Sequence, residues 1–140
     1  MDVIRLTEIR DSPLSVDEVR LAVADPAAGA IALFAGTVRH HDYGRPVTRL
    51  SYSAHPSAAD EMRRVAEKVA VDFPVYGLAA VHRVGDLAIG DLAVVVAVSC
   101  QHRAEAFEAC EVLIDEIKAS VPIWKHQHFG DGSEEWVGSA

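Results

Sequence analysis

Two lysines stand close together in the apolar stretch "IKASVPIWKH", at positions 118 and 125. Two ammonium groups that meet in a partly dry pocket repel each other, so that one loses its proton more readily or an anion binds between them. A lysine with a lowered pKa can act as a nucleophile or as a general base. Lys118 and Lys125 therefore indicate a site for proton transfer or for an anionic ligand.

The helix predicted over residues 102–120 must position the first lysine. At 100° per residue, five apolar residues fall within about 80° of one direction and predict the buried face: Phe107, Cys110, Ile114, Ile117 and Val121. Lys118 falls about 20° from the first of them, so we expect its side chain to point toward the core. Alternatively, its stem snorkels to water past the helix end, where a lysine also suits the helix dipole. The pattern leaves both interpretations open.

A turn at Pro122 must position the second lysine, because proline cannot continue the helix. A strand is predicted over 123–129. Alternation places Ile123, Lys125 and Gln127 on one face of it, and Trp124, His126 and His128 on the other. The turn can thus bring Lys125 back toward Lys118.

The remaining periodicities predict the elements around this site. Strands are expected at 3–9, 29–38, 47–54, 76–85, 92–100 and 135–138, and helices at 15–24 and 57–73. Ser15 and Glu18 form a capping box at the start of the first helix. Helices separated by pairs of strands predict an α+β fold with a mixed or antiparallel sheet, in a single domain spanning residues 1–140.

The composition restricts the classes of ligand that the chain is expected to bind. The formal net charge is −8, which disfavours nucleic acid and anionic membranes. Basic residues nevertheless gather with histidines at 39–45, 101–103 and 125–128, as expected for a small anionic ligand or for ordinary surface scatter. Two cysteines, no basic-then-apolar leader and no run of about 18 apolar residues predict a soluble cytoplasmic protein.

Histidine and cysteine chemistry offers two weaker alternatives. His126 and His128 would point the same way from a strand, which suits a chelate, but no third ligand stands at a diagnostic spacing, so we predict no metal site. Cys100, near His102, could act as a thiolate nucleophile. Cys110 lies on the apolar helix face and is more simply a buried small residue.

Four segments together resemble one family: "FAGTVRHHDYGRPVTRLSYSAHP", "VHRVGDLAIGD", "VSCQHRAEAFEACEVLIDEIKASVPIWK" and "EEWV". Over roughly residues 3–137 they are similar to the large, catalytic subunit of molybdopterin synthase, the MoaE family. The resemblance implies an α/β hammerhead fold with an additional antiparallel β subdomain. It also implies conversion of cyclic pyranopterin monophosphate (precursor Z) to molybdopterin by installing two sulfurs as a dithiolene, without a metal or organic cofactor.

The partners implied by the resemblance are protein subunits. Sulfur arrives as a thiocarboxylate on the C-terminal Gly-Gly tail of a small ubiquitin-like sulfur carrier, which threads into a pocket of the large subunit. The large subunits form a homodimer at the centre of a heterotetramer. A rival interpretation is that the chain is only a dock for such a tail, although a bare dock does not need a lysine pair.

The resemblance also assigns site residues one by one. Lys118 and Lys125 match the catalytic lysines, and the other substrate-contacting positions are Thr37, Val38, Arg39, His102, Arg103, His126 and Gln127. The guanidinium groups of Arg39 and Arg103 suit the phosphate, because they offer forked donors at fixed geometry. His126 and Gln127 stand where some relatives have Arg-Glu, so their individual roles remain open.

One distance on the long helix bears on assembly. Arg103 and Lys118 are 15 residues apart, which is about 22 Å on a helix. If both contact one substrate, we expect one of them to come from the other subunit of the dimer.

Overall fold

The structure, a computed structural model, describes residues 2–42 and 44–138. Its elements follow the predicted order, with two short strands added. In chain order they are β1 (Ile4–Arg10), α1 (Val16–Ala22), β2 (Ala30–Thr37), β3 (His41–Asp42), β4 (Arg45–Ala54), α2 (Ala58–Asp72), β5 (Val75–Arg83), β6 (Gly85–Leu87), β7 (Leu92–Cys100), α3 (Arg103–Ser120), β8 (Ile123–Phe129) and β9 (Glu134–Val137). The α+β prediction is confirmed.

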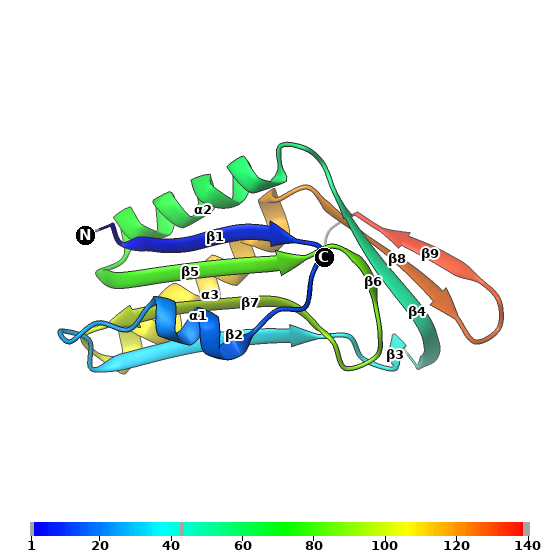
Figure 1. Ribbon diagram of the computed structural model, residues 1–140, viewed down its shortest axis with the longest axis horizontal. Coiled ribbons are helices and arrows are strands. Elements are labelled where there is room, and N and C mark those ends of the chain that lie inside the picture. Colours follow the sequence, from blue (N-terminus) through cyan, green and yellow to red (C-terminus); the bar gives the residue numbers. More distant parts are fainter. Residues whose placement is uncertain (1, 43, 139–140) are drawn as a thin grey trace.

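A four-stranded mixed sheet forms the main layer, with strand order β1-β5-β7-β2. The β1–β5 pair is parallel, and the other neighbours are antiparallel. Helices α2 and α3 cover one face, and α1 covers the other (Figure 1). Leu78 and Ala80 of β5 pack under α2 and α3, whereas Ala79 and Val81 pack under α1. Both faces of the central strands are therefore buried, which explains their nearly continuous apolar sequences.

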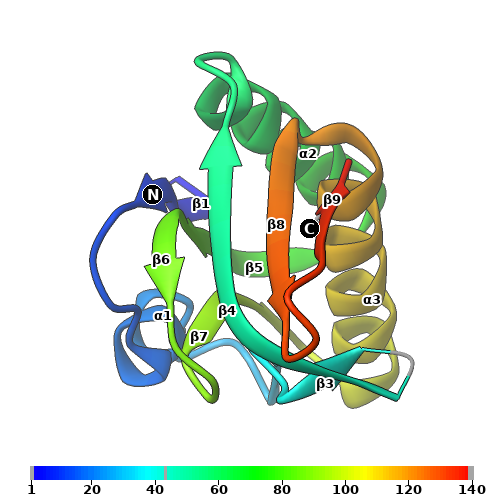
Figure 2. The same ribbon diagram turned by 90° about the vertical axis from the view of Figure 1, so that its right-hand side faces the viewer.

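A second, antiparallel sheet crosses one end of this layer, as Figure 2 shows. Its order is β3-β4-β8-β9, and β6 pairs with the free side of β4. A small cluster of Val38, Leu50, Leu87 and Ala93 packs where the two sheets meet. A main sheet with helices on both faces and an added antiparallel subdomain agrees with the fold that the resemblance implies.

The start of α1 corrects one local prediction. Ser15 caps the helix as expected, because its Oγ accepts a hydrogen bond from the Glu18 backbone N–H at 3.1 Å. The Glu18 carboxylate instead accepts hydrogen bonds from Arg10, at 2.6 and 2.8 Å. Only half of the predicted capping box forms, because the charged partner on β1 is the stronger donor. Within the described residues, no helix is long and apolar enough to cross a membrane.

Candidate active site

The buried face of α3 differs from the predicted one. Its buried residues are Ala106, Ala109, Cys110, Leu113, Ile114 and Ile117. On a helical projection these centre about 90° away from Phe107, which is 66% exposed. The prediction that Phe107 belongs to the core was wrong, because it left out two alanines and Leu113. Lys118 consequently lies about 110° from the centre of the buried face, on its flank.

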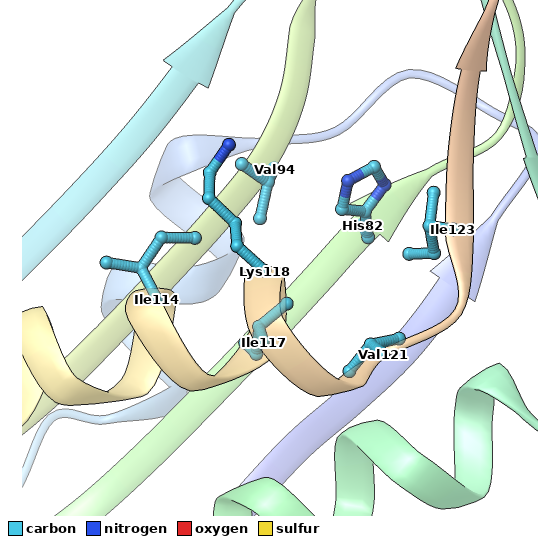
Figure 3. Close-up of a pocket in the computed structure, with 7 residues that line it drawn as sticks. All are labelled: His82, Val94, Ile114, Ile117, Lys118, Val121 and Ile123. Carbon is cyan, nitrogen blue, oxygen red and sulfur yellow. The ribbon is translucent and has the colours of Figure 1, made fainter. Parts of the chain in front are cut away.

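Lys118 is exposed and does not point into the core, which corrects the prediction. It stands in the last turn of α3, and its stem runs beside apolar side chains. Together they line a small cavity with room for about one water molecule (Figure 3). Its lining residues are His82, Val94, Ile114, Ile117, Lys118, Val121 and Ile123. The snorkelling alternative agrees better with the structure, because the stem of Lys118 lies along apolar side chains and its amine extends beyond them.

The side chain of Lys118 also lines a larger pocket, which is open to solvent and has about 940 Å³ of empty volume. This pocket lies where the end of β2, the middle of β4, β5, β7, the end of α3 and β8 come together. It contains six of the nine predicted site residues: Thr37, Val38, Arg39, Lys118, Lys125 and Gln127. Three of these, Arg39, Lys118 and Lys125, carry positive charge, so the pocket suits an anion.

Alternation along β8 sorts the predicted residues as expected. Lys125 and Gln127 line the pocket, whereas His126 does not. Gln127 is 3% exposed and donates a hydrogen bond to Asp42 Oδ2 at 3.0 Å. Arg39 donates to the other oxygen of Asp42 at 3.1 Å. The buried Asp42 carboxylate, which sequence reasoning missed, therefore ties Arg39 to the strand that carries Lys125.

The surroundings of Lys118 lower the pKa of its amine. Although the residue as a whole is exposed, its amine is half-buried in the pocket, and this burial contributes most, followed by the positive charges of Lys125 and Arg39. A pocket that disfavours the charged amine in this way lets Lys118 exchange a proton more readily than a surface lysine, and an entering anion offsets the repulsion. The predicted electrostatic coupling between the two lysines is present.

His82 is a second group that sequence reasoning missed. It is 2% exposed, lines both cavities, and lies 2.8 Å through Nδ1 from the Arg83 carbonyl oxygen. A carbonyl oxygen only accepts, so Nδ1 carries the hydrogen and Nε2 keeps a lone pair. Burial, and to a lesser degree Lys118, lowers the pKa of His82 to about 4, so the ring is neutral near pH 7. The sequence feature that could have identified this residue is a histidine inside the otherwise apolar run of β5.

Tyr52 completes the inner wall. Its ring meets that of His82 edge to face, with centroids 5.0 Å apart. Burial raises the pKa of Tyr52 to about 12, so its hydroxyl stays protonated near pH 7. Tyr52 also pairs across the sheet with Lys125. The pocket thus combines three cationic groups with two neutral groups that can exchange hydrogen bonds.

The structure does not bring the remaining predicted residues to this pocket. His102 is the N-cap of α3 and Arg103 is its first residue, so both lie at the opposite end of the helix from Lys118. His126 points away on the other face of β8. Within one chain, therefore, the pocket holds one of the two predicted arginines.

The cysteines do not suit nucleophilic catalysis. Cys100 and Cys110 are free and buried. Burial raises the pKa of both thiols, and that of Cys110 reaches about 11. Thiols in this state are protonated near pH 7 and shielded from a substrate, so the alternative of cysteine catalysis is not supported.

Comparisons with known proteins agree on one family. The family model described as "MoaE protein" matches residues 9–120. A relative from Mycobacterium tuberculosis, "Molybdopterin synthase catalytic subunit 1", is 45% identical in a 138-residue alignment that covers 93% of this chain and 88% of that protein.

Two solved structures have the same fold. The crystal structure of molybdopterin synthase from Staphylococcus aureus superposes with a TM-score of 0.87 at 34% identity, covering 94% of this chain and 96% of that one. A chain from a protein–protein complex of subunits 1 and 2 of molybdopterin-converting factor from Helicobacter pylori gives a TM-score of 0.73, covering 97% and 90%. At 24% identity, the second comparison speaks for the fold alone.

Proposed function

This chain belongs to the MoaE protein family of molybdopterin synthase catalytic subunits, and we propose that its pocket around Lys118 installs the two dithiolene sulfurs on precursor Z. The observation that carries the proposal is the convergence of Arg39, Lys118 and Lys125 on one open pocket. Both reactants are anions, a phosphorylated pterin and a peptide thiocarboxylate. Three cations from three separate elements suit the binding of two anions in one place.

Arg39 is the proposed phosphate ligand. Its side chain is 72% exposed, and one guanidinium nitrogen is held by Asp42 at 3.1 Å. This contact orients the planar group and leaves its other donors available for phosphate oxygens. Thr37 and Val38 form the adjoining rim, which places the backbone after β2 beside the bound substrate.

Lys118 and Lys125 are the proposed catalytic residues. In each round the thiocarboxylate sulfur forms a bond to a side-chain carbon of the pterin, the carbon–oxygen bond there breaks, and the departing oxygen takes up a proton. Water then cleaves the resulting thioester, leaving sulfur on the pterin and a carboxylate on the carrier tail. The lysines stabilise the oxyanions and supply protons, and the neutral His82 ring offers its Nε2 lone pair as a hydrogen-bond acceptor within the same pocket.

The proposed sulfur donor is the Gly-Gly tail of a small ubiquitin-like subunit. A tail without side chains fits a pocket whose inner end is closed by His82 and Tyr52. The relative from Mycobacterium tuberculosis is named a catalytic subunit, which supports a second subunit as the partner. We propose that the reaction takes place in the cytoplasm. We also propose that these steps proceed without a metal or organic cofactor.

A second copy of this chain is proposed to complete the site. Strand β2 forms an edge of the main sheet. Ile31 and Phe34 are exposed on β2, and Phe107 is exposed on the adjoining α3. Two copies related by a two-fold axis perpendicular to this edge would run their α3 helices in opposite directions. We propose that this arrangement brings the partner's Arg103 near Lys118, which lies about 22 Å from the Arg103 of its own helix.

Reconstitution tests the proposed function. The chain is combined with a thiocarboxylated small subunit and precursor Z, and dithiolene product is measured. Formation of molybdopterin with this chain, and none without it, is the expected result. Binding of precursor Z alone separates the enzyme from a bare dock, because a dock for the carrier tail would not bind the pterin. Failure of both measurements would refute the proposal.

A further inference from the structure

The outer face of the β8–β9 hairpin carries a cluster that the proposed reaction does not use. His126 and His128 point to the side of β8 away from Lys125 and Gln127. The strand register pairs His128 with Glu134 of β9. The ligand atoms of His126, His128 and Glu134 all lie within 4.8 Å of one another. Strand β9 thus supplies the third ligand that sequence spacing did not reveal.

We propose that His126, His128 and Glu134 bind one divalent transition-metal ion of the class of zinc, nickel or copper(II). Two imidazoles and one carboxylate form a donor set that such ions prefer and leave further positions open for water. The site lies on the opposite face of β8 from the pocket, so this inference does not depend on the proposed function.

The distances require only small movements. His126 Nε2 lies 2.7 Å from Glu134 Oε1, and His128 Nδ1 lies 3.7 Å from the same oxygen. Tetrahedral zinc with bonds of about 2.0–2.1 Å separates its ligand atoms by about 3.3 Å. The two separations from Glu134 must therefore open or close by less than about 1 Å, and the two histidine nitrogens, which lie within 4.8 Å of each other, must approach by up to about 1.5 Å. The Glu134 side chain is 55% exposed, which leaves it room to adjust.

The ligands are partly held in place before an ion binds. The Trp136 ring stacks on His126 with centroids 4.0 Å apart and an interplanar angle of 5°. Backbone pairing between β8 and β9 fixes the spacing of His128 and Glu134. Groups that orient a ligating histidine strengthen metal binding, because less side-chain freedom is lost when the ion enters.

The positive charge of Arg49 should weaken metal binding, and its removal therefore provides a test of the site. Its Nη2 lies 3.0 Å from His128 Nε2. An ion on Nδ1 requires the hydrogen of the neutral ring to sit on Nε2, which then cannot accept from Arg49. The guanidinium must turn away, and its positive charge repels the ion. Removing this charge should strengthen metal binding, whereas a purely structural histidine–carboxylate hydrogen bond would give no such effect.

Titration of tag-free, metal-stripped protein with Zn²⁺ in a calorimeter tests the site. We expect one ion per chain, and at least about tenfold weaker binding in His126→Asn and in Glu134→Gln. His41→Asn is the matched control, because His41 is exposed and adjoins His40 without forming this cluster. Its affinity should equal that of the unmodified chain. Circular dichroism of the metal-free variants checks that each retains the fold.

Two further measurements report on the location of the ion. Arg49→Gln should bind Zn²⁺ several-fold more tightly. In a Trp124→Phe background, Cu²⁺ should quench the fluorescence of Trp136 in proportion to occupancy, and His126→Asn should abolish this quenching. Absence of saturable Zn²⁺ binding, unchanged affinity in Glu134→Gln or in Arg49→Gln, or loss of binding in His41→Asn would each overturn the proposal.

Discussion

Replacing Lys118 with alanine should separate catalysis from stability. In the proposed reaction the amine stabilises developing negative charge inside a pocket that contains two other cations. Loss of one such donor typically costs about 2.7–4 kcal/mol of transition-state stabilisation, or about 10²–10³ in kcat. We expect a decrease of at least this size, because Lys118 is also a proposed proton donor.

The same substitution should leave the fold nearly unchanged. Lys118 is exposed, lies on the flank of the buried face of α3, and is repelled by Lys125 and Arg39. Alanine also has the higher helix propensity by a few tenths of a kcal/mol. The free energy of unfolding should therefore change by no more than about 0.5 kcal/mol.

The assay is single-turnover dithiolene formation with saturating thiocarboxylated partner, accompanied by urea denaturation and by measurement of partner binding. Lys68→Ala is the matched control, since Lys68 is exposed on α2 and remote from the pocket. It should retain full activity. Normal turnover in Lys118→Ala, or a stability loss large enough to explain the inactivity, would refute the assignment of Lys118 to the chemistry.

Three further predictions address the electrostatics, the assembly and the core. Lys125→Gln removes a positive charge that lowers the pKa of Lys118, so this pKa should rise. The alkaline limb of the kcat/KM profile, where the protonated amine is lost, should then move to higher pH. An unmoved limb would mean that Lys118 is not the group that titrates there. An equal mixture of inactive Arg103→Ala and Lys118→Ala chains should regain about a quarter of the unmodified activity after random subunit exchange, because half of the dimers hold one intact site. No rescue despite proven exchange would contradict a composite site. Leu113→Ala, at a fully buried position on α3, should lose about 2–5 kcal/mol of unfolding free energy in urea, and a loss below 1 kcal/mol would contradict its place in the core.

Strand periodicity predicted the site better than helical periodicity did. On β8 a period of two residues separates only two faces, and the face predicted to carry Lys125 and Gln127 is the one that lines the pocket. On α3 the direction of the predicted buried face depended on which apolar residues were used to define it. Phe107 biased the projection, because it is large and apolar yet 66% exposed at the edge of the sheet. Apolar identity alone does not distinguish a core position from one that can meet another chain.

The groups that sequence reasoning missed are those that tertiary contacts define. Asp42 reads as a loop residue, and only its hydrogen bonds to Arg39 and Gln127 make it part of the site. His82 occupies a strand position that an aliphatic residue could fill, and its role follows from burial beside Lys118. Long-range contacts of this kind leave no local period in the sequence, which explains why the composition suggested an anion site without locating its inner wall.

The position of the pocket at the junction of the two sheets accounts for the unusual sequence around Pro122. A lysine inside the main core would be left without solvent, and one on the outer face of α3 would be an ordinary surface charge. The last turn of α3 avoids both, since its flank borders the open pocket that it shares with β8. Pro122 then ends the helix and directs the chain into β8, where alternation places Lys125 on the same pocket. Two lysines separated by a helix end and a strand start can thus meet an anion from two directions, which neither a continuous helix nor a continuous strand would permit.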